Sequence, residues 1–203
     1  MSEYDSHRYA RVNRWDPSHL RRIDRLLPME PGQRVLEVGC GQGHLTMRLA
    51  ARGIDVVGID ANPNAAEVSG SNRVRHMRAE DLEFDDAEFE AIVSVHAIEH
   101  IPPLERAVSE MARVLKPGGQ ALFIYPAEPI QGLYAIPTSV ILHGTPLKAR
   151  QVHCHRLTPS KVRRLMGAYG LVETHHEFNL LKSPQFISLF SKPGPETGRP
   201  RAD

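Results

Sequence analysis

Three glycines in the stretch E-V-G-C-G-Q-G at 37–43 carry the clearest chemical signal in the sequence. Gly39, Gly41 and Gly43 let the backbone turn sharply and let a ligand lie against the peptide plane. A helix is predicted directly after them, and its free N–H groups would face a nucleoside that carries a carboxylate or a phosphate. The G-x-G-x-G spacing puts His44 where a dinucleotide-binding loop has its last glycine, which disfavours a nicotinamide-dependent dehydrogenase. An ordinary glycine turn is the alternative.

An aspartate ends the second apolar run of the chain, I-D-V-V-G-I-D at 54–60. Asp60 follows Gly39 at about the 20-residue spacing expected of an acid that binds ribose. At the end of the second strand of a β-α-β unit, its two carboxylate oxygens can accept hydrogen bonds from two ribose hydroxyls. A solvated turn acid is the alternative.

Several side chains could take a proton from a reacting group. His96 and His100 follow the predicted strand at 89–95, Tyr125 ends the strand at 120–125, and His153 or His155 precedes the last predicted helix. A histidine at its ordinary pKa suits general base catalysis near neutral pH. For His100 the alternative is a residue that packs and hydrogen-bonds the loop without touching substrate.

The cysteines predict neither a metal site nor a disulfide framework. His153, Cys154 and His155 are consecutive, but alternate residues of an extended chain point in opposite directions, and no second ligand pair has zinc spacing. Cys40 lies inside the glycine turn, where a small apolar residue fits by packing. Two cysteines in 203 residues favour a reducing compartment.

The elements that position these residues alternate between strand and helix. Apolar runs predict strands at 35–38, 54–60, 74–77, 89–95, 120–125, 171–179 and 186–190. Helical spacing and capping signals predict helices at 16–27, 45–50, 62–68, 104–115 and 159–169. This order predicts an α/β fold, a doubly wound and mostly parallel sheet in a three-layer α/β/α sandwich.

Composition limits the classes of partner. A formal net charge of +1 gives no general attraction to nucleic acid or to a membrane surface. No leader and no apolar run of membrane-spanning length stands out, so we expect a cytoplasmic protein with a small-molecule partner. A homodimer stays open.

We expect a single domain over 1–192 and a disordered tail over 193–203. Residues 1–30 would form an N-terminal helical lid, with a frayed terminus as the alternative for the first part, and 126–156 a cap over the substrate. The apolar residues of the cap suggest a partly apolar acceptor: Tyr134, Ile136, Val140, Ile141 and Leu142. Lys148, Arg150 and Arg156 would bind an acidic group on it, or are solvated charges.

Several motifs together resemble one enzyme family. They are E-V-G-C-G-Q-G at 37–43, G-I-D at 58–60, A-E-D-L at 79–82, A-I-E-H-I at 97–101 and L-K-P-G-G at 115–119, with a weaker match at 155–161. This pattern resembles the class I, Rossmann-like S-adenosylmethionine-dependent methyltransferases, in particular the small-molecule type that includes the ubiquinone-pathway O-methyltransferases. The resemblance implies seven strands with an antiparallel last strand, and S-adenosylmethionine as cofactor.

The resemblance also implies a set of cofactor-binding residues. In chain order they are Glu37, Gly39, Gly41, Gly43, Asp60, Ala61, Asn62, Ala79, Glu80, Val95 and His96. Glu37 would order the turn, Asp60 would bind the ribose, and Ala79 with Glu80 would meet the adenine edge. Arg78 stands where many relatives carry an acid, so either Glu80 takes over the adenine contact or backbone alone makes it.

The function implied is methyl transfer to a small molecule, with oxygen favoured over nitrogen or carbon as the acceptor atom. Positioning supplies most of the rate enhancement in such an in-line displacement. The alternatives are methylation of a peptide or tRNA, and a protein that binds the cofactor without catalysis. The lack of a basic surface argues against RNA.

Overall fold

The computed structural model describes residues 16–127, 154–180 and 184–194. These residues form a seven-stranded sheet in the order β3-β2-β1-β4-β5-β7-β6. The strands are β1 (Arg34–Val38), β2 (Asp55–Asp60), β3 (Val74–His76), β4 (Phe89–Val95), β5 (Leu115–Pro126), β6 (Val172–Asn179) and β7 (Gln185–Ser191). β1 to β5 pair in parallel, whereas β7 runs antiparallel between β5 and β6. The predicted α/β fold with an antiparallel last strand is confirmed.

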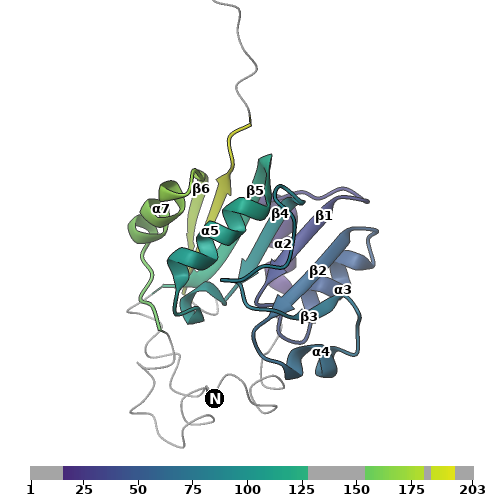
Figure 1. Ribbon diagram of the computed structural model, residues 1–203. Helices are drawn as coiled ribbons and strands as arrows, with labels where there is room; N and C mark the ends of the chain where they lie inside the picture. The colour runs from purple at the N-terminus through teal and green to yellow at the C-terminus, as the bar shows by residue number, and fades with distance from the viewer. Residues whose placement is uncertain (1–15, 128–153, 181–183, 195–203) are drawn as a thin grey trace, which may run out of the picture.

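Helices cover both faces of the sheet, as Figure 1 shows. They are α2 (Pro17–Leu26), α3 (His44–Ala50), α4 (Asn64–Ser69), α5 (Leu104–Val114) and α7 (Pro159–Ala168), with a short 3-10 turn, η2 (Ile98–His100). α5 and α7 pack on one face, and α2 and α3 pack on the other. α4 packs beside the edge strand β3. The chain in 16–127, 154–180 and 184–194 contains no helix with the length and apolarity to cross a membrane.

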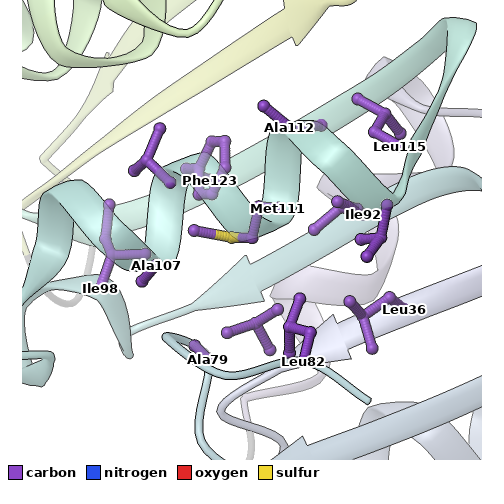
Figure 2. Close-up of a cluster of buried hydrophobic side chains, with 14 of the residues drawn as sticks. Leu36, Ala79, Leu82, Ile92, Ile98, Ala107, Met111, Ala112, Leu115 and Phe123 are labelled. Carbon is purple, nitrogen blue, oxygen red and sulfur yellow. The ribbon is translucent and has the colours of Figure 1, made fainter. Parts of the chain in front are cut away.

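The larger hydrophobic core lies between the sheet and α5 (Figure 2). Met111 and Ala107 of α5 pack down onto Ile92 and Phe123 of the central strands. The spacing of Ala107 and Met111 is helical, which is why the sequence predicts this helix. The core holds the carboxyl ends of the parallel strands at one edge of the sheet, where ligands bind in such folds.

β5 begins earlier than predicted. The sequence predicts a turn at 116–119 and a strand from 120, but Leu115 already pairs with Phe89 of β4. The register then shifts, because Gln120 pairs with Ala91 and leaves the intervening residues as a bulge. Gly118, with φ +81°, and the backbone bonds of this bulge to Lys192, the residue that follows β7, explain how a turn sequence joins the ladder.

The remaining elements follow the prediction to within a few residues at their ends. Thr158 caps α7 by accepting from the backbone N–H of Lys161, and Asp16 caps α2 by accepting from that of Ser18. The first half of the expected 1–30 lid, most of the 126–156 cap and the tail after 194 lie outside the described residues.

Candidate functional site

A pocket lies at the carboxyl edge of the sheet, between the start of α2, the glycine loop and the end of β4. Its lining combines acidic, histidine and backbone groups: Asp16, His19, Glu37, Gly39, Cys40, Gln42, His44, Leu45, Val95 and His96. Glu37, Gly39, Val95 and His96 are in the set that the family resemblance implies. The structure therefore brings the end of β1 and the end of β4 together around one space.

The glycine loop is held by backbone hydrogen bonds to the neighbouring strand. The N–H groups of Gly39 and Cys40 both donate to the carbonyl of Ile59, at 2.8 and 2.9 Å. Gly39 has φ +76°, and a Cβ atom built there would collide with the Cβ of Ala97. Only glycine fits this position, and the bare backbone that results faces the pocket.

Asp60 fastens the loop to the second strand. Its Oδ2 accepts from the N–H of Gly41 at 2.8 Å, and its Oδ1 accepts from the N–H of Asn62 at 2.8 Å. Burial raises the pKa of Asp60, although these two backbone bonds oppose the rise. Each carboxylate oxygen can accept more than one hydrogen bond. The carboxylate is therefore preorganised to accept further donors at the end of β2.

Glu37 is a buried acid in the pocket wall, and only 4% of its surface is exposed. Its Oε2 accepts from the hydroxyl of Thr46 in α3 at 2.5 Å. Burial raises the pKa of Glu37 to about 7, against the effect of the Thr46 hydrogen bond. A positively charged ligand group in the pocket would favour its ionised form.

His96 follows β4 in a left-handed backbone conformation, with φ +52°. Its Nε2 lies 2.9 Å from Oε1 of Gln185, and its Nδ1 lies 3.6 Å from Oε1 of Glu99. Burial lowers the pKa of His96, but the Glu99 carboxylate and Gln185 together raise it above its ordinary value. A histidine beside a buried carboxylate is a group that can accept and hold a proton.

His19 is a pocket residue that the sequence analysis missed. It lies on α2, is 8% exposed, and its Nε2 is 3.3 Å from the same Gln185 oxygen. Burial, reinforced by the nearby His96, lowers the pKa of His19 to about 4, so it is neutral at pH 7. It precedes the buried Ile23 by one helical turn, a signal that would have placed it on the inner face of α2.

Three other candidate bases, His100, His155 and Tyr125, are not among the described residues that line this pocket, and His153 lies outside the described part of the chain. His100 lies with Nε2 3.9 Å from Glu99 Oε1. His155 contacts backbone: its Nε2 is 2.7 Å from the carbonyl of Ile101. Tyr125 is completely buried, its hydroxyl is 3.2 Å from Ser188 Oγ, and burial raises its pKa to about 12.

The residues expected to border adenine lie around the ends of β2 and β3. Ala79 is 6% exposed and packs in the core shown in Figure 2, so it offers only backbone to a ligand. Glu80 forms an ion pair with Arg78 at 2.5 Å. Ala61 is exposed, whereas Asn62 is buried and its Oδ1 accepts from the N–H of Asn64. The Glu80 carboxylate is therefore paired with Arg78, the residue that departs from the family pattern.

Cys40 packs against Ala65 and Val74, and burial raises the pKa of its thiol well above the ordinary value. Both observations fit a packing role and not a nucleophile. Within the described part of the chain, no three His, Cys, Asp or Glu side chains come together as a metal-binding group.

Comparison with known proteins identifies relatives. A family model described as a methyltransferase domain matches residues 4–176. The ubiquinone biosynthesis O-methyltransferase of Alkalilimnicola ehrlichii is 33% identical over 117 residues, which are 53% of this chain and 47% of that protein. The 27-O-demethylrifamycin SV methyltransferase of Amycolatopsis mediterranei is 32% identical over 110 residues, 49% of this chain and 40% of that protein. The chain spans about half the length of the curated relatives it matches.

Solved structures share the fold at low sequence identity. One is the putative methyltransferase in complex with the Haloferax volcanii Trm112 activator, with TM-score 0.70, 16% identity, and coverage of 95% of this chain and 99% of that one. Another is Haemonchus contortus phosphoethanolamine N-methyltransferase 2 in complex with S-adenosyl-L-methionine, with TM-score 0.69, 18% identity, and coverage of 93% and 57%. At such identities the likeness establishes the architecture alone.

Proposed function

The chain belongs to the methyltransferase-domain family, as its motifs predicted, and from this premise we propose that it transfers a methyl group from S-adenosylmethionine to a small-molecule acceptor. Oxygen is the proposed acceptor atom. Two relatives whose printed names specify O-methylation or an O-demethylated substrate support that choice.

The observation that carries the proposal is the hydrogen-bonded contact between the glycine loop and Asp60. The loop presents bare backbone where a side chain at Gly39 would collide with Ala97, and Asp60 is held directly beside it through Gly41. A flat backbone surface next to a carboxylate with spare lone pairs fits a nucleoside with two ribose hydroxyls. The buried carboxyl of Glu37 fits the cationic amino acid end of the same cofactor.

We assign the cofactor-binding roles accordingly. Gly39, Gly41 and Gly43 form the floor, Asp60 accepts from the ribose hydroxyls, and Glu37 faces the methionine amino group. The remaining proposed contacts border adenine and methionine: Ala61, Asn62, Ala79, Glu80, Val95 and His96. When bound, the cofactor supplies an electrophilic methyl group on a sulfonium.

His96 is the proposed general base. It lies in the pocket wall, with Nε2 directed at the Gln185 oxygen, so Nδ1 is the atom that would take the acceptor's proton, and the Glu99 carboxylate 3.6 Å from Nδ1 would stabilise the imidazolium that forms. In this proposal His100 is not a base but lies beside Glu99. His155 contacts the backbone carbonyl of Ile101, and Tyr125 packs in the core with its hydroxyl near Ser188. Most of the expected lid and substrate cap falls on 1–15 and 128–153, outside the described residues.

Calorimetry with S-adenosylmethionine tests the cofactor site. We expect stoichiometric binding by the wild-type protein and an affinity loss of about tenfold to a hundredfold in Asp60→Ala, from the loss of charge-assisted hydrogen bonds. Asp55→Ala is the matched control, because Asp55 begins the same strand at the opposite edge of the sheet. Unchanged affinity in Asp60→Ala, or no heat and no thermal shift with the wild type at millimolar cofactor, would refute the site.

Transfer of labelled methyl from the cofactor to a metabolite extract tests the activity. Label in small molecules supports the proposal, and acid-stable label in protein would redirect it to a peptide acceptor. Cofactor binding without any incorporation would identify a binding protein that lacks catalysis.

A further inference from the structure

Gln185 is a buried residue whose carboxamide contacts two histidines of the pocket wall, and neither the motifs nor the proposed activity accounts for it. It begins β7, where it pairs with Pro126 of β5 and Asn179 of β6, and it is 3% exposed. Because β7 is antiparallel, its first residue lies at the sheet edge where the parallel strands end. Its neighbours at alternate positions, Ile187 and Leu189, belong to the core under α2, so Gln185 shares that face.

One oxygen of this side chain contacts two histidines that are distant in sequence. Oε1 lies 2.9 Å from Nε2 of His96 and 3.3 Å from Nε2 of His19. The two rings are 5.5 Å apart and tilted by 53°. A carboxamide oxygen has two lone pairs and can accept from both rings at once. Each histidine is thereby held with a proton on Nε2, and the pair is tied to β7.

His96 needs such a restraint more than an ordinary loop residue does. Its backbone is left-handed, and its N–H donates to the carbonyl of Ile124 in β5 at 2.8 Å. On the other side of the ring, the buried Glu99 carboxylate lies 3.6 Å from Nδ1. The His96 ring therefore lies between the Glu99 carboxylate and the Gln185 carboxamide, and these two groups together define its orientation toward the pocket.

We propose that Gln185 is a positioning residue for methyl transfer, one that orients His96 and couples it to α2 through the shared contact with His19. This inference rests on the proposed function for its catalytic meaning. The coupling follows from geometry, because α2 approaches the sheet with His19 against the same oxygen. A shift of α2 away from the sheet would break that contact and change the environment of His96.

Other titratable and charged groups surround His96, and a test must separate them from Gln185. They are Asp16 at the N-cap of α2, His19 on α2, Glu37 on β1, His44 at the start of α3, and Glu99 and His100 in η2. Substitutions at Gln185 leave all of these in place. Changes in the titration of His96 that follow such substitutions therefore report the carboxamide.

The test is an NMR pH titration of the histidine imidazoles in the full-length protein, with His96 assigned by its absence in His96→Gln. Gln185→Leu removes the acceptor at similar size and should lower the pKa of His96. Gln185→Glu replaces it with an anionic acceptor and should raise that pKa above the wild-type value. Opposite shifts are the expected signature, since a purely structural role would move both variants the same way or not at all.

Gln120→Leu is the matched control, because Gln120 pairs with Ser191 at the far end of β7. It should leave the His96 titration unchanged. Identical His96 titrations in the wild type and both Gln185 variants would overturn the inference. If Gln185→Leu does not fold by circular dichroism, the upward shift in Gln185→Glu decides alone.

Calorimetry and transfer assays separate this inference from the proposed function. Gln185→Leu should bind S-adenosylmethionine within about twofold of the wild type, while labelled-methyl transfer falls by about tenfold, the loss of one buried hydrogen bond. A wild type that binds no cofactor would refute the proposed function yet leave the His96 titration result standing. Equal transfer rates in Gln185→Leu and the wild type would refute the positioning role.

Discussion

Replacement of Glu37 by glutamine should stabilise the cofactor-free protein above neutral pH. Glu37 is 4% exposed and accepts a hydrogen bond from Thr46, which the carbonyl oxygen of a glutamine of the same shape can also accept. Burial raises its pKa from 4.5 to about 7. The ionised carboxylate is therefore costly in the folded state unless a cation faces it.

The sign and size follow from the two pKa values. Between pH 4.5 and about 7 the folded protein holds a proton that the unfolded chain has released, so the free energy of unfolding falls as pH rises through this window and levels off above it. A pKa difference of about 2.5 at about 1.4 kcal/mol per pKa unit corresponds to about 3.5 kcal/mol as an upper value. Glu37→Gln removes this loss and should show little difference from the wild type near pH 4.5.

Urea unfolding followed by circular dichroism at several pH values between 4.5 and 8.5 measures the difference. We expect the two stabilities to diverge as pH rises, with the variant more stable, while its affinity for S-adenosylmethionine is weaker because the anionic partner is gone. A difference in stability that stays constant with pH would refute the assignment of this titration to Glu37. Thr46→Val, which removes the hydroxyl but keeps the acid, should retain the wild-type direction of pH dependence.

Three further predictions follow from the core and the pocket. Gly39→Ala should lower the free energy of unfolding by about 1–3 kcal/mol in urea unfolding and abolish cofactor binding in calorimetry, because φ is +76° and Ala97 occupies the space of the new Cβ. Met111→Ala should lower the free energy of unfolding by about 2–5 kcal/mol in the same assay, since the side chain is completely buried between α5 and the sheet. Its cofactor affinity, measured where the variant is fully folded, should be unchanged. His19→Asn should reduce the loss of stability on acidification between pH 6.5 and about 4, where the unfolded chain binds a proton that the folded His19 excludes; an unchanged acid limb would contradict its lowered pKa.

The parallel part of the fold was predictable because its signals are local. Val35 to Val38 and the run 89–95 are short apolar segments next to glycine or helix signals, and the structure contains β1 and β4 there. The predicted start of β5 was wrong, because a proline–glycine sequence normally ends the pairing between two strands. Here the pairing of Leu115 with Phe89 and the bonds to Lys192 continue the strand past it, and these partners are remote in sequence.

The residues of the candidate site also divide into those that have a local sequence signal and those that have none. Asp60 and the glycine loop have a fixed spacing, so the sequence placed them side by side, and the bond between Asp60 and Gly41 joins them in the structure. The contact between His19 and Gln185 was not predicted, because it joins residues 166 positions apart in the sequence and has no local pattern. Glu99 stood within a recognised motif, but only its burial beside His96 indicates a role.

The alternation along β7 places unlike environments at consecutive positions. Gln185 faces α2 and the histidines, whereas Phe186 faces α7, where its ring lies 5.7 Å from that of Tyr125 and 5.4 Å from that of Phe178. Substitutions at odd-numbered positions of this strand therefore reach one compartment, and those at even-numbered positions reach the other. A mutational scan of the seven residues of β7 can therefore change the contacts of the α2 face and those of the α7 face separately.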